Sequence, residues 1–320
     1  MSTTRHGRFI AALLLVAVLA LGSALLAACG ADDEAGTAGI SPSAVAGGPI
    51  TVTDDAGVEV TLDEPAEAIV SLAPSNTEIA FAVGAGSKMV AGTSYDDYPE
   101  EAKALPKIGD FANPNVEKIA SYSPDLILAA GGIQADLRTQ LEDLGMVVYV
   151  ADPKTYEGVI ATIEDIGKLA GTEDVAAAVT DAMKAAQADV RAAVGDLTTA
   201  TTFLEIYSEP LMTAGKDTFI DDMIAIAGGE NIGATAGSGF PTFSTEVLVQ
   251  TDPEVYIADS GAMSDPGDID KRAGFSELTA IKEGRVYVID DNIIARPGPR
   301  LADGLRTLAR YIHPEAESAQ

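Results

Sequence analysis

The chain carries one αβ phrase twice, at a constant offset of 129 residues. Residues 111–132 read FANPNVEKIASYSPDLILAAGG, and residues 240–261 read FPTFSTEVLVQTDPEVYIADSG. Each copy has an aromatic residue, a polar helix start, a Glu in the first turn, a short apolar helix, a proline and an apolar strand. The offset is a domain length rather than a solenoid period, so the repeat predicts two similar lobes with a cleft between them. Chance similarity in a chain rich in alanine and glycine is the alternative. The identical pairs are Phe111 with Phe240, Glu117 with Glu246, Pro124 with Pro253, Ala129 with Ala258 and Gly132 with Gly261.

The remaining patterns favour an α/β fold. Residues 50–62 alternate around an Asp-Asp-Ala-Gly turn, which predicts a hairpin. Apolar strands then alternate with helical segments, a pattern typical of a parallel sheet. Ser75 and Glu78 have the spacing of a capping box, so Ser75 is expected to cap the helix after the first strand of this sheet.

A long helix is expected between the two copies of the phrase. Residues 172–197 contain no glycine or proline before Gly195, and good helix formers dominate. The position of this segment favours an interlobe spine over an ordinary surface helix. The predicted organisation is an N-terminal lobe over 50–171, a spine over 172–197 and a C-terminal lobe over 198–320.

The N-terminus reads as an export signal. Residues 1–28 have a basic start and a long apolar run, and they end in Leu-Ala-Ala before Cys29, the single cysteine of the chain. This ending resembles the lipobox of bacterial lipoproteins, in which the cysteine is lipidated; an uncut membrane anchor is the alternative. Residues 29–49 are small, polar and aperiodic, which predicts a flexible tether between a membrane anchor and the folded chain.

Composition excludes several classes of function. The signal holds two Arg and no acidic residue, so its removal shifts the formal net charge from −29 to −31. Such a surface disfavours nucleic acid as a partner. His6 leaves with the signal and His313 remains, so a zinc site of several histidines is excluded. We predict no metal site, no cofactor and no enzyme activity, although a secreted hydrolase that uses two carboxylates stays open on composition.

Two stretches resemble a known family. IVSLAPSNTEIAFAVGAG (69–86) and TSYDDYPEEAKALPKIGDFANPNVEKI (93–119) are similar to the type III substrate-binding proteins of bacterial ABC importers, most of all to the vitamin B12-binding branch. EPLMTAGKDTFIDDMIAIAGGENI (209–232), FPTFSTEVL (240–248) and ARPGPR (295–300) agree. The resemblance covers about residues 66–315. It implies two Rossmann-like lobes joined by a single long helix, with the ligand in the cleft.

The resemblance also implies roles for particular residues. Glu117 and Glu246 match the paired acids that dock on arginine pockets of a permease dimer, which works with an ATPase. The alternative is that each Glu only complements its helix dipole. The expected cleft residues are Ser75, Tyr95, Phe111, Met212, Phe240 and Arg296. For Phe111 and Phe240 the alternative is a place in the core.

The ligand is less constrained than the transport role. Known binders of vitamin B12 line the cleft with several Trp, and this chain has none. A pair of Phe residues with Arg296 as a polar handle suits a corrinoid, and it equally suits a haem or a ferric siderophore. The sequence and the resemblance together predict a monomeric, extracytoplasmic, lipid-anchored binding protein for a corrinoid, with a ferric siderophore or haem as the alternative ligand.

Overall fold

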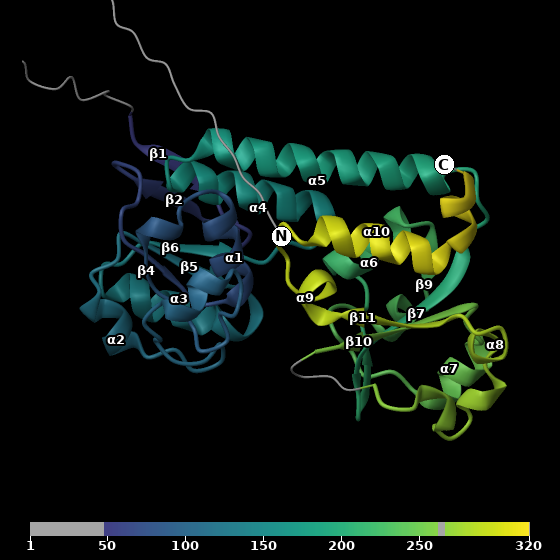
Figure 1. The fold of residues 1–320 in the computed structure, drawn as a ribbon. Coiled ribbons are helices and arrows are strands. Elements are labelled where there is room, and N and C mark those ends of the chain that lie inside the picture. Colours follow the sequence, from purple (N-terminus) through teal and green to yellow (C-terminus); the bar gives the residue numbers. More distant parts are fainter. Residues whose placement is uncertain (1–47, 262–265, 320) are drawn as a thin grey trace, which may run out of the picture. The chain divides into compact units, whose positions relative to one another are not determined.

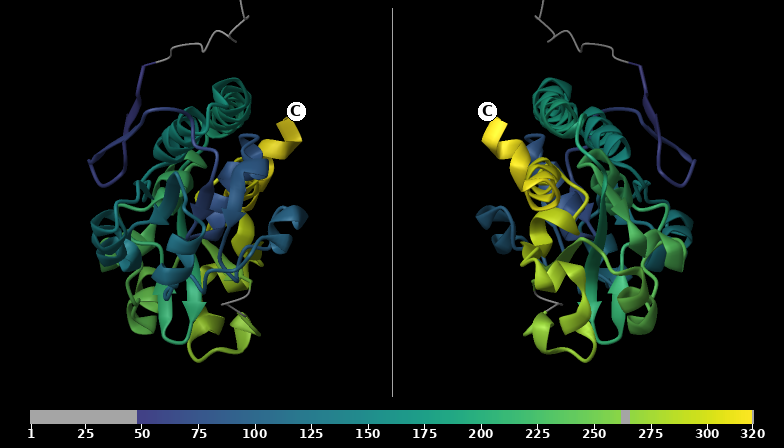
Figure 2. Two further views of the ribbon diagram at one scale, coloured as in Figure 1. Left: turned by 90° about the vertical axis from the view of Figure 1, so that its left-hand side faces the viewer. Right: turned by 90° about the vertical axis from the view of Figure 1, so that its right-hand side faces the viewer.

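The computed structural model describes residues 48–261 and 266–319. The described chain opens with the predicted hairpin, in which β1 (Ile50–Thr53) pairs antiparallel with β2 (Glu59–Leu62). Its turn closes because Asp54 Oδ1 accepts hydrogen bonds from the backbone N–H of Ala56 and Val58, at 3.1 and 2.9 Å. Figure 2 shows the hairpin at the periphery of the ribbon, where the described chain begins.

The N-terminal lobe is built on a four-stranded parallel sheet of order β4-β3-β5-β6. Its central strands are apolar along their length because helices cover both faces of a parallel sheet. The strands are β3 (Ile69–Ser71), β4 (Met89–Ala91), β5 (Leu126–Ala130) and β6 (Val148–Ala151). The helices are α1 (Pro74–Ala82), α2 (Val116–Ser121), α3 (Ala135–Asp143) and α4 (Tyr156–Leu169).

The C-terminal lobe contains a five-stranded sheet of order β11-β10-β7-β8, with β9 also paired to β7. All pairs are parallel except β7 with β8, an antiparallel addition that the sequence patterns did not predict. The strands are β7 (Ala200–Ser208), β8 (Leu211–Thr213), β9 (Gly229–Asn231), β10 (Val255–Ser260) and β11 (Val286–Asp290). The helices are α6 (Phe219–Ile226), α7 (Thr245–Thr251), α8 (Thr279–Lys282), α9 (Asp291–Ile294) and α10 (Leu301–Ile312).

The repeated phrase folds the same way in both lobes. The pair α2–β5 in the first copy corresponds to α7–β10 in the second, and both strands begin at the offset seen in the sequence, Leu126 and Val255. The acidic residue before each strand makes the same kind of hydrogen bond in both copies. Asp125 accepts from the backbone N–H of Ala68 at 2.9 Å, and Glu254 accepts from the backbone N–H of Thr201 at 2.8 Å. The lobes therefore share backbone architecture and local chemistry.

A single long helix joins the two lobes. Helix α5 (Glu173–Val194) has 22 residues, about 33 Å at 1.5 Å per residue, and it runs past both sheets in Figure 1. It packs against α4 and α10. Its buried residues recur at helical spacing: Ala176, Thr180, Met183, Ala186, Val190 and Val194. In the part of the chain that the structure describes, no helix combines the length and apolarity needed to cross a bilayer.

One apolar core extends through both lobes. Alternate residues of each central strand face it, as Leu126 does in β5 and Val255 in β10, together with Met183 of α5 and Leu305 of α10. The opposite faces of the two sheets are covered by separate cores, one in each lobe. The fold is thus two α/β lobes fastened along one side by a shared helical layer.

The predicted capping box is wrong. Helix α1 begins at Pro74, after Ala73 at the N-cap, and no side chain caps it. Proline favours the first helical position because its missing N–H needs no partner there. Ser75 therefore lies inside the first turn, and Glu78 is free to pair elsewhere.

Candidate functional site

The lobes meet where the segments after β3 and β11 come together. Glu78, on α1, pairs with Arg296 and Arg300, two residues of the segment that precedes α10; Arg300 is the N-cap residue of that helix. Arg296 Nη1 donates to Glu78 Oε1 at 2.9 Å, while Arg300 Nε and Nη2 donate to Oε2 and Oε1 at 2.9 and 2.6 Å. The Glu78 side chain is only 2% exposed. Carboxyl ends of parallel strands are where α/β folds place their ligands, so this junction marks the candidate site.

A second acid completes the junction. Arg296 Nη1 and Nη2 donate to the two oxygens of Asp97, at 2.6 and 3.3 Å. The hydrogen bond from Arg296 lowers the pKa of Asp97 below its ordinary value, so this carboxylate is ionised at neutral pH. The guanidinium carbon of Arg300 lies 4.2 Å from the ring centroid of Tyr98, a cation–π contact. Glu78 as an ion-pair partner, Asp97, Tyr98 and Arg300 were not among the predicted cleft residues.

The loop that carries the tyrosines is held rigidly. Asp96 is buried and accepts from the backbone N–H of Thr93 and the hydroxyl of Thr77, each at 2.9 Å, and from the Thr93 hydroxyl at 2.6 Å. Burial raises the pKa of Asp96, and these hydrogen bonds oppose that shift. The fixed loop presents Tyr95 and Tyr98 to solvent, 55% and 48% exposed. Two large aromatic side chains are therefore exposed on an ordered loop, where a ligand could contact them.

Phe111 lies on a loop that one buried amide ties to the strand ends. Gln134 Nε2 donates to the carbonyl oxygens of Phe111 and Leu72, both at 2.8 Å, and its Oε1 accepts from the backbone N–H of Ala130 at 2.8 Å. Gln134 therefore connects the ends of β3 and β5 with the start of the first repeat. The Phe111 residue itself is half-buried.

Met212 and Phe240 lie on adjacent segments of the C-terminal lobe. Residues 241–243 run antiparallel to residues 211–213, with hydrogen bonds from Thr213 N–H to the Pro241 carbonyl at 3.1 Å and from Phe243 N–H to the Leu211 carbonyl at 2.8 Å. Met212 is half-buried, whereas Phe240 is 47% exposed. Phe240 is therefore not a core residue, in contrast to Phe243 and Phe203.

Of the predicted cleft residues, Arg296 makes hydrogen bonds across the junction between the lobes. Arg296 reaches the N-terminal lobe, and a Cβ at Gly298 would be in ordinary van der Waals contact with α1, 3.8 Å from the Ser75 carbonyl oxygen. Within residues 48–261 and 266–319, no ring contact joins Phe111 to Phe240. A ligand that touches both lobes would have to bridge them.

Carboxylates collect at the ends of β10 and β11. Asp259 is 3% exposed, and its Oδ1 has no hydrogen-bond partner. Burial, and then the charge of Asp291, raise the pKa of Asp259 to about 7. Among the described residues, no group of three His, Cys, Asp or Glu has the geometry to hold a metal ion. His313 lies elsewhere, buried at the end of α10, where Nε2 pairs with the Gly228 carbonyl at 3.1 Å.

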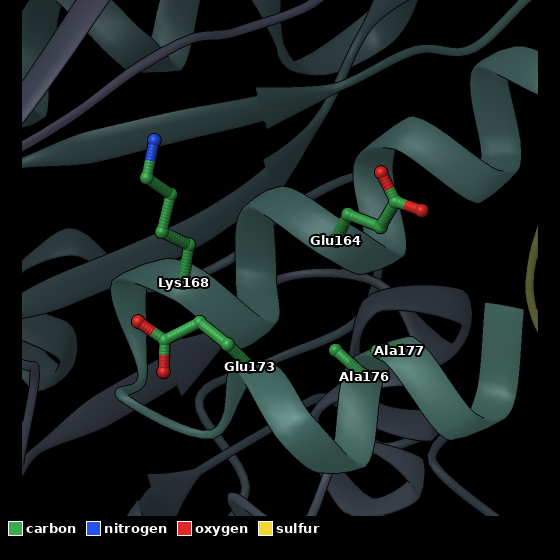
Figure 3. Close-up of a pocket in the computed structure, with 5 residues that line it drawn as sticks. All are labelled: Glu164, Lys168, Glu173, Ala176 and Ala177. Atoms are coloured by element: carbon green, nitrogen blue, oxygen red, sulfur yellow. The ribbon is translucent and has the colours of Figure 1, made fainter.

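Two hollows lie away from the predicted cleft residues. One of about 1180 Å³ lies between α5 and the C-terminal segment that contains α10, and includes Arg306 and His313. The other, of about 270 Å³, lies between α4 and α5 and is lined by Glu164, Lys168 and Glu173 (Figure 3). In the second hollow, Glu164 is already paired with Lys184 at 2.7 Å. Neither hollow contains a residue predicted from the sequence to bind ligand.

The two predicted docking acids occupy equivalent places. Glu117 and Glu246 are each the second residue of a short helix, α2 and α7, and both are exposed. The preceding N-cap side chains, Asn115 and Ser244, accept from the backbone N–H three residues on, at 2.8 and 3.4 Å. The caps fix both helix starts, so the acids project from matching elements. Cys29, the predicted lipidation site, lies outside the described residues.

Comparison with known proteins covers both lobes. The profile of the periplasmic binding protein family matches residues 69–293. An uncharacterised ABC transporter substrate-binding lipoprotein, YvrC of Bacillus subtilis (strain 168), is 35% identical over 309 residues, which cover 93% of this chain and 96% of that protein.

Solved structures share the fold. The periplasmic vitamin B12 binding protein BtuF of Vibrio cholerae is 29% identical, with a TM-score of 0.72 over 79% of this chain and 98% of that one. The periplasmic haem-binding protein RhuT of Roseiflexus sp. RS-1, in its apo form, is 27% identical, with a TM-score of 0.69 over 78% and 99% of the two chains.

Proposed function

The chain belongs to the periplasmic binding protein family, and from this premise we propose that it is a lipid-anchored protein that captures a corrinoid between its lobes and delivers it to an ABC importer. Its family consists of substrate-binding components of transport systems, which act outside the cytoplasm with a permease and an ATPase. The choice of a corrinoid, the lipid anchor on Cys29 and the docking roles of Glu117 and Glu246 are the finer parts of the proposal.

The observation that carries the ligand proposal is the exposure of aromatic side chains on fixed loops. Tyr95 and Tyr98 are held by the buried Asp96, and Phe240 by the backbone pairing of its loop. A flat macrocycle gains apolar contact from such side chains at little entropic cost, because the loops that carry them are already ordered. Ser75, Phe111, Met212 and Arg296 are proposed to complete the cleft.

The direct test is calorimetric titration with cyanocobalamin, haem and a ferric siderophore. We expect cyanocobalamin to bind at or below about 1 μM, or about −8 kcal/mol. Phe240→Ala and Tyr95→Ala should each weaken binding by about 1–3 kcal/mol, because each removes apolar contact. Leu144→Ala is the matched control, since Leu144 is also exposed, at 58%, but lies at the end of α3.

These titrations test the identity of the ligand separately from the transport role. Tight binding of haem or of the siderophore, with no response to cyanocobalamin, would keep the transport role and refute the corrinoid. Equal losses in Phe240→Ala and Leu144→Ala would refute the placement of the cleft.

A further inference from the structure

The arginines at the lobe junction are already neutralised by the protein. Glu78 accepts three hydrogen bonds from Arg296 and Arg300, and Asp97 takes two more from Arg296. Two guanidinium groups thus face two carboxylates at hydrogen-bond distance. A site that binds an anionic ligand would instead contain an arginine or lysine that is not already paired with a carboxylate of the protein.

On this geometry, and resting on the proposed function, we propose that the cargo is a chelate without free carboxylates and that Asp97 excludes anionic chelates from the cleft. Asp97 is the accessible member of the network, with a side chain 53% exposed against 18% for Arg296 and 2% for Glu78. A ligand carboxylate that approached Arg296 would have to displace Asp97 and would leave two like charges side by side. Such a juxtaposition is a recognised means of rejecting a wrong partner.

The surroundings add negative charge. Besides Glu78, the junction includes the segments 92–99 and 291–300, which contain two basic residues, Arg296 and Arg300, and three acidic ones, Asp96, Asp97 and Asp291. The whole chain carries a formal charge of −29. The field at the junction therefore opposes anions, most strongly at low ionic strength.

Arg300 is unavailable as an anion receptor for a second reason. Its Nε and Nη2 donate to the two carboxylate oxygens of Glu78, and its guanidinium carbon lies 4.2 Å from the centroid of the Tyr98 ring. Releasing it would break a buried ion pair and a cation–π contact together. The pairing of Arg300 with Glu78 therefore holds α1 and the segment before α10 together. Arg296 and Asp97 are the members of the network that we propose to contact the ligand.

The test compares two ligands that differ by one charge: cyanocobalamin and its monocarboxylic acid, in which one peripheral amide is hydrolysed. Both are titrated by calorimetry against the wild type, Asp97→Asn and Asp189→Asn. Asp189 is an exposed acid on α5, so its variant has the same change in net charge away from the junction.

We expect the wild type and Asp189→Asn to favour the amide by about tenfold, and Asp97→Asn to lose most of that preference through tighter binding of the acid. Added salt should weaken the preference in the wild type. Equal affinity of the wild type for both ligands, or an unchanged preference in Asp97→Asn, would overturn the inference. A thermal melt confirms that each variant is folded.

Failure of the proposed function gives a different result. If the wild type binds neither corrinoid, the same three proteins are titrated with haem, which carries two propionates, and with ferrichrome, an uncharged ferric chelate. A preference for ferrichrome refutes the corrinoid and keeps the exclusion of anions. Tighter binding of haem than of ferrichrome overturns the exclusion itself.

Discussion

The contribution of Glu78 to stability can be worked out from its contacts. Its carboxylate is buried and accepts hydrogen bonds from two arginines of the other lobe. Glu78→Ala would leave two guanidinium groups, 18% and 21% exposed, without their shared anion. Removing one partner of a fully buried pair costs about 3–5 kcal/mol. Arg296 keeps Asp97, and both arginines reach water, so we expect a loss of about 2–4 kcal/mol in the free energy of unfolding.

Urea denaturation measures this loss as a shift of the midpoint at constant m-value. Asp97→Asn is the matched control, because it removes an exposed partner of the same Arg296, and it should cost about 0–1 kcal/mol. The triple variant Glu78→Leu, Arg296→Met, Arg300→Leu removes all charge from the contact and should regain most of the stability lost in Glu78→Ala. A loss below about 1 kcal/mol in Glu78→Ala would refute the reasoning. So would a triple variant as unstable as the single one.

Three further predictions concern transport, anchoring and pH. The double variant Glu117→Ala, Glu246→Ala should bind its ligand with wild-type affinity and lose uptake in cells, since both acids are exposed in the first turns of short helices and neither is a proposed cleft residue. A parallel loss of ligand binding would place them in the cleft instead. Cys29→Ala should abolish labelling by a radioactive fatty acid and release the protein from membranes, and continued retention after normal signal cleavage would contradict lipidation. Asp259 has a pKa of about 7 in the folded chain, above its ordinary value, so the folded state binds more protons than the unfolded one. The contribution of Asp259 to the free energy of unfolding is therefore fully present below about pH 4 and is lost as the pH rises through about 7. Between these pH values, the urea midpoint should fall more steeply in the wild type than in Asp259→Asn.

Local patterns in the sequence predicted much of the fold. The repeated phrase gave two α–β pairs in register, and the lack of glycine and proline gave helix α5, found at Glu173–Val194. These features depend on periodicity and on backbone propensity within short windows. The addition of β8 was missed because three residues that pair antiparallel with the end of β7 carry no recognisable strand pattern.

The candidate site was predicted less completely, because its defining contact is not local. Glu78 and Arg296 are 218 residues apart, and the short-range pattern around Glu78 pointed to a cap that Pro74 displaces. Arg296 and Tyr95 were reached through the family resemblance. Asp97 and Tyr98 lie in the same family-like stretch as Tyr95, residues 93–119, yet nothing in the spacing of that loop indicates which of its side chains faces an arginine from the other lobe.

The shared core bears on the order of folding during synthesis. Leu301, Leu305 and Leu308 of α10 belong to the same core as Val255 of β10 and Met183 of α5, and α10 packs on both elements, so this core stays incomplete until the C-terminal helix has left the ribosome. A lobe released alone would expose the apolar face that its partner covers. For a chain proposed to be exported, the segments made first would therefore reach the membrane before the helix that completes their core has been added.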